Sequence, residues 1–321
     1  MPGGVKTNAK HMMAPLLIVA TALLCIFAGP ATALELKTIT VGGVERSYAI
    51  HLPATATNRL AVPVVFVLHG AGGRGEQALN IYKWIAKADS EGFIVVAPDA
   101  SRVNPDMPAS FLFNPTVWND GSGRGGTAVR ASNDVGMIDA LIDELGKRYP
   151  IDRRRIYATG FSSGASMVQR LGIERAKMLA AIAPVSGHLW SGEVKPERGL
   201  SILYLVGNSD PVVPYNGGRA ELPWGVEENA QPAKDVPKLW ADLNSCTDTP
   251  RPLESRPHVQ AVVWINCRDR AEVVFYTIDG MGHQWPGGKR GVLPSVWVGD
   301  YSKAVDATDL IWAFFRRHSL N

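Results

Sequence analysis

Residues 62–68 form a continuous apolar run that stops at His69-Gly70, and this run constrains the fold more than any other feature of the sequence. A strand that is apolar at every position is typical of a parallel sheet covered by helices on both faces. Similar runs lie at residues 93–97, 155–159, 180–185, 202–206 and 273–278. Segments with helical periodicity alternate with them at residues 77–88, 133–148, 163–171, 235–243 and 306–317. The alternation predicts an α/β fold with a mostly parallel central sheet.

Two further segments complete this organisation. Residues 36–41 and 47–52 flank Gly42-Gly43 and predict an opening hairpin. Residues 101–130 show no periodicity and are interrupted by Gly and Pro, which predicts a long, functional surface loop. Because we find neither an internal repeat nor a linker, we expect one catalytic domain over residues 34–321.

The first 33 residues have the features of a secretory signal peptide. Lys6 and Lys10 precede an uncharged apolar stretch over residues 14–29, and Ala31-Thr32-Ala33 supplies the small residues that signal peptidase requires. The stretch is shorter than the roughly 20 residues of a membrane-spanning helix. We therefore expect cleavage after Ala33 and secretion to the periplasm or the medium, without a stable membrane span. An uncleaved anchor is the alternative.

Composition excludes several other classes of protein. The chain has 321 residues and a formal net charge of +3 without a run of basic residues, so we expect no nucleic-acid partner. Three cysteines are too few for a disulfide scaffold or a dedicated zinc site, and we expect no metal and no organic cofactor. Cys25 leaves with the signal peptide, so Cys246 and Cys267 predict one disulfide in the exported chain. Two buried free thiols are the alternative.

The sequence Gly160-Phe161-Ser162-Ser163-Gly164 lies between an expected strand and an expected helix. A turn this sharp strains the backbone of its central residue, and the flanking glycines avoid clashes with the strand and the helix. Its serine hydroxyl would stand above the carboxyl edge of the sheet. We expect Ser162 to be a nucleophile and the Ser163 amide to be one donor of an oxyanion hole. An ordinary glycine-rich turn is the alternative.

A serine hydroxyl needs a base beside it to act as a nucleophile at neutral pH. His283 follows the last expected strand, so it returns to the same edge of the sheet as Ser162. We expect His283 to be the base, with His188 as the second choice.

The base in turn needs an acceptor that fixes its tautomer. Asp210 follows the strand at residues 202–206 and is the best choice, whereas Asp134 and Asp99 are weaker ones. The order Ser162, Asp210, His283 along the chain is also the order found in hydrolases with this type of nucleophile turn.

The second oxyanion donor is expected from His69-Gly70-Ala71-Gly72-Gly73, directly after the strand at residues 62–68. Glycines let this backbone approach a substrate oxygen, and we favour the Ala71 amide over that of Gly72. His69 would shape the loop and line the substrate site. The loop lacks the Lys-Ser/Thr ending of a phosphate-binding loop.

Tryptophan side chains are the expected substrate contacts. Trp118 lies in the long loop and Trp285 lies two residues from His283. Exposed indole faces stack on sugars, phenolic acids or apolar polyester chains, so we expect both residues to bind substrate. Burial in the core is the alternative.

These motifs, together with two further segments, resemble the polyhydroxybutyrate depolymerase and feruloyl esterase family of secreted α/β-hydrolases. The further segments are Ser209-Asp210-Pro211-Val212-Val213-Pro214-Tyr215 and Gly282-His283-Gln284-Trp285-Pro286-Gly287-Gly288. The resemblance covers residues 36–318 and implies Ser162 as nucleophile, Asp210 as acid and His283 as base. Some members carry Cys at the position of Ala71, a change that leaves the backbone donor in place.

The sequence therefore predicts a secreted serine esterase that cleaves carboxylic esters of a polyester or of plant polysaccharides through an acyl-enzyme. An acyltransferase with the same nucleophile and a non-catalytic carbohydrate-binding protein are the alternatives. The natural ester and the oligomeric state stay open at this point.

Overall fold

The computed structural model describes residues 1–4, 34–54, 60–190, 194–221, 227–291 and 293–321. Residues 1–4 have no regular secondary structure, and Thr32–Asn321 forms one compact unit. The expected signal peptide lies outside the described residues from residue 5 onward.

The compact unit is built on a ten-stranded sheet with the order β1-β2-β4-β3-β7-β8-β9-β14-β13-β12. Neighbours from β4 to β14 are parallel, and the pairs at both ends of the sheet are antiparallel. The strands are β1 (Leu34–Val41), β2 (Val44–His51), β3 (Val62–Leu68), β4 (Ile94–Pro98), β7 (Ile151–Phe161), β8 (Ala181–Val185), β9 (Ser201–Gly207), β12 (Arg251–Arg256), β13 (Val259–Trp264) and β14 (Val273–Ile278). The predicted α/β fold with a mostly parallel sheet is confirmed.

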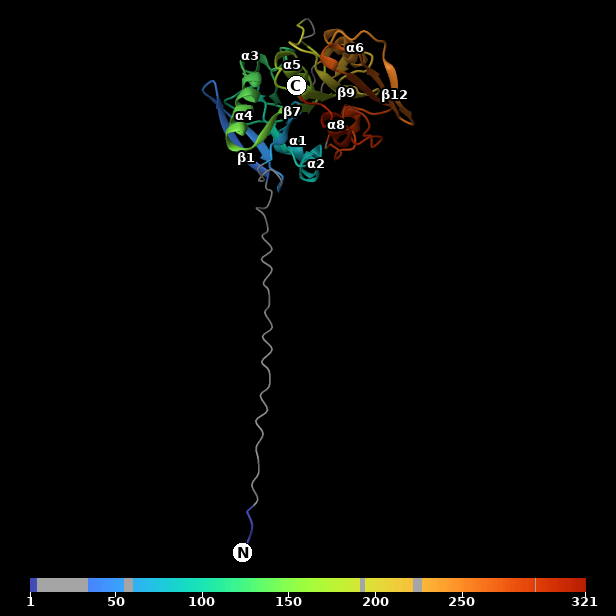
Figure 1. Ribbon diagram of the computed structural model, residues 1–321. Helices are drawn as coiled ribbons and strands as arrows, with labels where there is room; N and C mark the ends of the chain where they lie inside the picture. The colour runs from blue at the N-terminus through green and yellow to red at the C-terminus, as the bar shows by residue number, and fades with distance from the viewer. Residues whose placement is uncertain (5–33, 55–59, 191–193, 222–226, 292) are drawn as a thin grey trace. The chain divides into compact units, whose positions relative to one another are not determined.

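Helices cover both faces of this sheet (Figure 1). One face packs against α1 (Gly75–Ile81), α2 (Trp84–Glu91) and α8 (Ala307–Phe315), and the other against α4 (Asp134–Arg148), α5 (Ser163–Glu174) and α6 (Val236–Leu243). Strand β3 is apolar throughout because both of its faces are buried. Phe66 and Leu68 enter the core on the second face, and Val65 and Val67 enter the core on the first. Shorter elements are α3 (Gly126–Arg130), α7 (Ser295–Val298), β5 (Ser101–Arg102), β6 (Thr116–Val117), β10 (Gly218–Glu221), β11 (Glu227–Ala230) and single 3₁₀ turns at Ala233–Asp235 and Arg268–Arg270.

Several elements differ from the sequence prediction, among them one helix and two strands. The helix expected at residues 77–88 is two helices, because Lys83 has a left-handed backbone (φ 63°) that ends α1 and starts α2. The antiparallel strands β12 and β13 were not predicted at all. Strand β12 is an edge strand whose side chains are largely exposed, so it carries no apolar pattern to detect.

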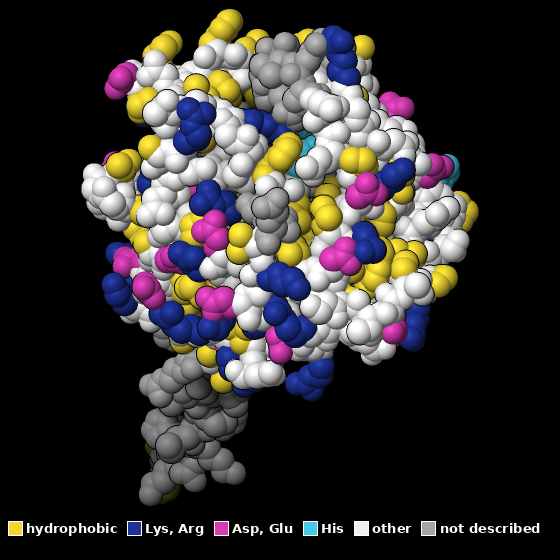
Figure 2. Space-filling view, turned by 90° about the horizontal axis from the view of Figure 1, so that it is seen from above, with side chains coloured by type: hydrophobic (Ala, Val, Ile, Leu, Met, Phe, Trp, Pro, Cys, Tyr) yellow, Lys and Arg dark blue, Asp and Glu magenta, His cyan; other side chains and the backbone are white. Residues whose placement is uncertain are grey.

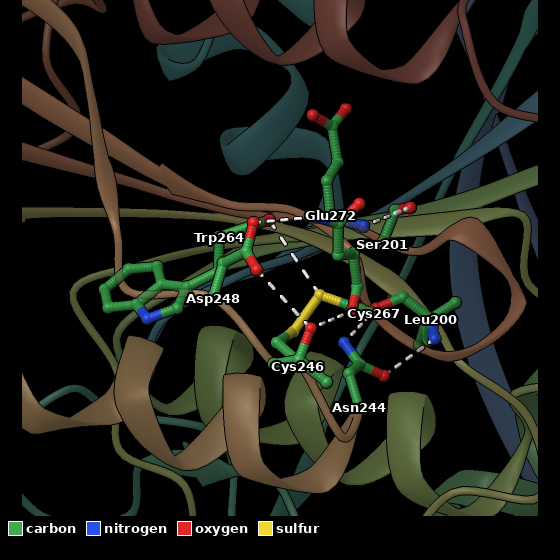
Figure 3. Close-up of a disulfide and its surroundings, with 10 residues drawn as sticks. Leu200, Ser201, Asn244, Cys246, Asp248, Trp264, Cys267 and Glu272 are labelled. Atoms are coloured by element: carbon green, nitrogen blue, oxygen red, sulfur yellow. Dashed lines mark hydrogen bonds between the residues drawn. A yellow bond between two sulfur atoms is a disulfide. The ribbon is translucent and has the colours of Figure 1, made fainter.

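Cys246 and Cys267 form a disulfide, which confirms that prediction (Figure 3). Beside it, the Asn244 amide exchanges two hydrogen bonds with the backbone of Leu200, at 2.8 and 2.9 Å. Leu200 immediately precedes β9, so the disulfide lies at the amino end of that strand.

The surface shows no segregation of charge on the face seen in Figure 2, where acidic and basic side chains are interspersed. Among the helices that the structure describes, none has the length and apolar character to cross a membrane.

Candidate active site

The turn between β7 and α5 has the strained geometry expected for a nucleophile. Ser162 has φ 56° and ψ −123°, and its amide donates to the Val185 carbonyl at 3.0 Å. A Cβ atom on Gly160 would lie 2.7 Å from the backbone of Gly164, and one on Gly164 would lie 2.4 Å from the Leu68 carbonyl oxygen. The turn therefore needs glycine at both positions to bring β7, β3 and α5 together.

Three side chains that are distant in sequence meet at the carboxyl edge of the sheet. The Nε2 atom of His283 lies 2.8 Å from Ser162 Oγ, and its Nδ1 atom lies 2.8 Å from Asp210 Oδ2. A carboxylate only accepts hydrogen bonds, so Nδ1 carries the proton and Nε2 is free to accept from the serine hydroxyl. The order of donors and acceptors is that of a serine-hydrolase relay.

Asp210 is fixed by its second oxygen. Oδ1 accepts hydrogen bonds from the amides of Val212 and Val213 at 2.9 and 2.8 Å, and the side chain is fully buried. These bonds orient the carboxylate, which in turn holds the imidazole of His283.

The residues considered as alternatives for the base and for its acceptor lie in other environments. Asp134 forms a buried ion pair with Arg46 at 2.7 Å, and Asp99 accepts from the Gly75 amide at 2.7 Å. His188 is buried beside the site, and burial lowers its pKa to about 4. These contacts make Asp134 and Asp99 structural groups that join β2, α1 and α4.

The hydrogen bonds of the glycine-rich loop after β3 bear on the choice between Ala71 and Gly72 as oxyanion donor. The Gly72 amide donates to the Thr116 carbonyl at 2.8 Å, so it has no hydrogen left for a substrate oxygen. Within the described part of the chain, the Ala71 amide donates no backbone hydrogen bond. Ser163 is the first residue of α5, where an amide has no helical carbonyl to bind. The arrangement favours Ala71 and Ser163 as oxyanion donors.

His69 and Trp118 brace this loop and offer no open face to a substrate. The Ala100 amide donates to His69 Nε2 at 3.0 Å, so Nδ1 carries the proton and donates to the Gly70 carbonyl at 2.7 Å. The Trp118 indole donates to the His69 carbonyl at 2.8 Å. Both side chains are only 1% exposed, and burial lowers the pKa of His69. These contacts favour a role in shaping the loop over the expected role in lining the substrate site.

Trp285, which was expected to contact substrate, is likewise buried. Its indole is 3% exposed, stacks on Tyr82 with ring centroids 4.3 Å apart, and donates to Thr308 Oγ1 at 3.1 Å. A ring that is enclosed on these sides anchors the loop that carries His283.

The long loop is more ordered than its sequence indicates. The buried amide of Asn114 donates to the carbonyls of Asn104, Met107 and Pro108 at 2.9–3.1 Å. Next to it, the Thr116 hydroxyl donates to the Gly73 carbonyl at 2.7 Å. The sequence does not predict this anchor, because a single asparagine in an aperiodic segment gives no signal. The loop is thereby fixed against the glycine-rich loop after β3.

No cluster of three or more potential metal ligands occurs in the described segments. The polar groups gathered at the site are a hydroxyl, an imidazole, a carboxylate and two backbone amides.

A mostly parallel sheet with a strained Gly-Phe-Ser-Ser-Gly turn at its carboxyl edge defines the α/β-hydrolase fold. The chain belongs to the phospholipase/carboxylesterase family, whose profile matches residues 54–223, more than half of the chain.

Curated relatives agree with this assignment. Feruloyl esterase B of Piromyces equi is 30% identical over 251 residues, which are 77% of this chain and 44% of that protein. A bifunctional acetylxylan esterase/xylanase of Neocallimastix patriciarum is 25% identical over 239 residues, which are 73% of this chain and 30% of that protein. The chain thus spans less than half the length of both relatives.

Among solved structures, the acetyl xylan esterase from Aspergillus awamori matches with a TM-score of 0.53 and 17% identity, over 78% of this chain and 94% of that one. A thermostable esterase matches with a TM-score of 0.53 and 16% identity, over 89% of this chain and 63% of that one. At this identity the likeness concerns the fold alone.

Proposed function

We propose that the protein is a secreted serine esterase that hydrolyses carboxylic esters attached to a polymer, with Ser162, His283 and Asp210 as its triad. The observation that carries the proposal is the chain of two 2.8 Å contacts from Ser162 through His283 to Asp210.

The first half of the reaction acylates the serine. Ser162 Oγ attacks the ester carbonyl carbon while His283 Nε2 takes the hydroxyl proton. The carbonyl oxygen becomes an oxyanion that accepts from the Ala71 and Ser163 amides. The intermediate then collapses, the bond to the alcohol breaks, and His283 returns the proton to the departing alkoxide.

The second half hydrolyses the acyl-enzyme by the same path. Water attacks the acyl carbon as His283 removes its proton, and a second oxyanion forms at the same amides. Ser162 leaves with the proton from His283, and the carboxylic acid is released. Asp210 stays charged throughout and stabilises the imidazolium in both halves.

The substrate that we favour is an acyl or feruloyl ester on a plant polysaccharide. The names of the relatives, feruloyl esterase and acetylxylan esterase, support this class of substrate. A polyhydroxybutyrate-type polyester is the other class that the family resemblance allows, and it enters the test below.

Secretion is supported by two features. Residues 1–33 have the composition of a signal peptide, and the disulfide suits an oxidising compartment.

Ser162→Ala tests the triad. We expect the rate on a short p-nitrophenyl ester to fall by about 10⁴-fold or more, because the triad members act as a unit. Ser209→Ala, which changes an exposed serine one residue from Asp210, is the matched control and should keep wild-type activity. A fluorophosphonate probe should label the wild type and the control but not Ser162→Ala. Retention of most activity by Ser162→Ala would refute the assignment.

An ester panel tests the substrate class. Methyl ferulate, acetylated xylan and short hydroxybutyrate oligomers are compared by kcat/KM, with and without an added sugar acceptor. We expect the ferulate or the acetylated xylan to be hydrolysed faster than the oligomers. Preference for the oligomers would move the protein to the polyester class, and transfer exceeding hydrolysis would make it an acyltransferase.

A further inference from the structure

We propose that Phe161, the residue before the nucleophile, is a positioning residue for His283. The centroid of its phenyl ring lies 4.6 Å from that of the imidazole, with the two planes tilted by 37°. In this arrangement Phe161 holds the imidazole in place and stabilises the positive charge that it gains during the reaction. The inference rests on the proposed triad.

The half-buried ring of Phe161 is bordered by three separate segments. His283 lies against it from the loop after β14, and Tyr82 at the end of α1 meets it edge-on, with centroids 6.0 Å apart. A Cβ atom on Gly70 would lie 3.3 Å from Cδ1 of the same ring, so the glycine-rich loop also borders it closely. Because Phe161 directly precedes the strained Ser162, its ring is fixed to the same turn as the nucleophile.

The loop that carries His283 is tied to this ring system at a second point. Trp285 stacks on Tyr82 with centroids 4.3 Å apart and an angle of 13°. The contacts therefore run from Trp285 through Tyr82 and Phe161 to His283, and they begin and end on the same loop. This arrangement restrains the loop relative to the nucleophile turn.

The contact between Phe161 and His283 is expected to affect the rate of the reaction, because His283 becomes charged during it. Asp210 accepts a hydrogen bond from Nδ1 of His283, whereas the phenyl ring of Phe161 packs against the imidazole ring. The face of a phenyl ring is electron-rich, and it attracts a cation whose centre lies within about 6 Å of the ring centroid. In the proposed reaction, His283 gains a positive charge when it takes the serine proton. The attraction therefore acts in the transition state and the intermediates, which affects kcat and leaves substrate binding unchanged.

Phe161→Leu removes the ring and keeps most of the apolar volume. We expect kcat on a short p-nitrophenyl ester to fall about tenfold while KM stays within about twofold of wild type. Phe161→Tyr keeps an aromatic ring, so it should restore most of the lost kcat. Thermal unfolding of each variant reports the folded fraction, to which kcat is normalised.

The chain offers a matched control on α8. Phe314 lies with its ring centroid 4.5 Å from that of His318 at a tilt of 45°, which is nearly the same pair geometry away from Ser162. Phe314→Leu should lower the thermal unfolding temperature, because the side chain is buried, but it should leave kcat per folded molecule unchanged.

Several outcomes would overturn the role of Phe161. They are an unchanged kcat in Phe161→Leu, a raised KM with wild-type kcat, which would make Phe161 a substrate contact, and an equal loss in Phe161→Tyr and Phe161→Leu. Ser162→Ala measured in parallel separates this failure from that of the proposed function. An active Ser162→Ala refutes the triad, whereas an inactive one with unchanged Phe161→Leu refutes only the positioning role.

Discussion

At the scale of single residues, His188 shows what burial does to a titratable side chain beside the site. The residue is 1% exposed, and neither ring nitrogen has a hydrogen-bond partner among the described residues. Asp210, Arg124 and His283 are close enough to act on its charge, but desolvation is the largest influence and lowers its pKa to about 4. A neutral ring at this place avoids a second positive charge next to the imidazolium that forms on His283.

This burial predicts a loss of stability on the acid side. The pKa of His188 is about 4 in the folded protein, against about 6.5 in an unfolded chain. Between these values the unfolded state binds more protons than the folded state. The free energy of unfolding therefore reaches its full value above pH ~6.5. It decreases as the pH drops towards ~4, and His188 accounts for roughly 3 kcal/mol of the decrease. Urea unfolding of wild type, His188→Leu and His188→Gln over this range measures the slope.

Both substitutions should flatten the slope, because neither replacement titrates. If both variants kept the wild-type dependence on pH, the acid-side loss would come from other groups.

At the scale of elements, loops of different origin are fixed to one another at the carboxyl edge of the sheet. The glycine-rich loop after β3 is hydrogen-bonded to β6 through Gly72 and Thr116, and the loop after β14 is held by the stacking of Trp285 on Tyr82. The disulfide serves the opposite end of the sheet, where it joins the end of α6 to the segment before β14. Substitutions at the disulfide should therefore leave the carboxyl edge of the sheet unchanged.

Removal of the disulfide should cost stability without affecting chemistry. The two cysteines are 21 residues apart, and closing a loop of that length stabilises a protein by about 3 kcal/mol. We expect Cys246→Ser/Cys267→Ser to lower the free energy of unfolding by about this amount. The value of kcat/KM at low temperature should stay at the wild-type level. A loss of activity in the fully folded double variant would show that the disulfide affects the site.

At the scale of the whole molecule, the compact unit has two cores, one on each face of the sheet, and the proposed triad lies at the sheet's edge. The described structure of this unit begins with Leu34 in β1, which pairs with His51 at the other end of the hairpin. The proposed cleavage after Ala33 would leave every strand of the sheet intact.

The boundary at residue 33 can be tested on the mature chain. We expect residues 34–321, produced with an oxidised disulfide, to unfold at the same temperature as the full chain and to have the same kcat/KM. Mass spectrometry of the exported protein should find Leu34 as its first residue. An intact amino terminus on a membrane-bound protein would favour the uncleaved anchor instead.

The sequence by itself determined the opening hairpin and the parallel part of the sheet, the nucleophile turn and the order of the proposed triad. These features rest on local patterns: apolar runs, glycine on both sides of Ser162, and polar residues directly after strands. The predicted disulfide also needed only the number of cysteines and the expected compartment. Strand β12 escaped prediction because an exposed edge strand has no such pattern.

Only the tertiary structure decided which side chains are buried beside the proposed triad and which partners they contact. Trp118 and Trp285 are enclosed by partners far away in sequence, His69 and Thr308 among them, and Gly72 gives its amide to Thr116. The contact between Phe161 and His283 likewise joins the end of β7 to the loop after β14, which are far apart in the sequence. Exposure and hydrogen-bond partners depend on what the rest of the fold places beside a residue, and a local pattern does not contain that information.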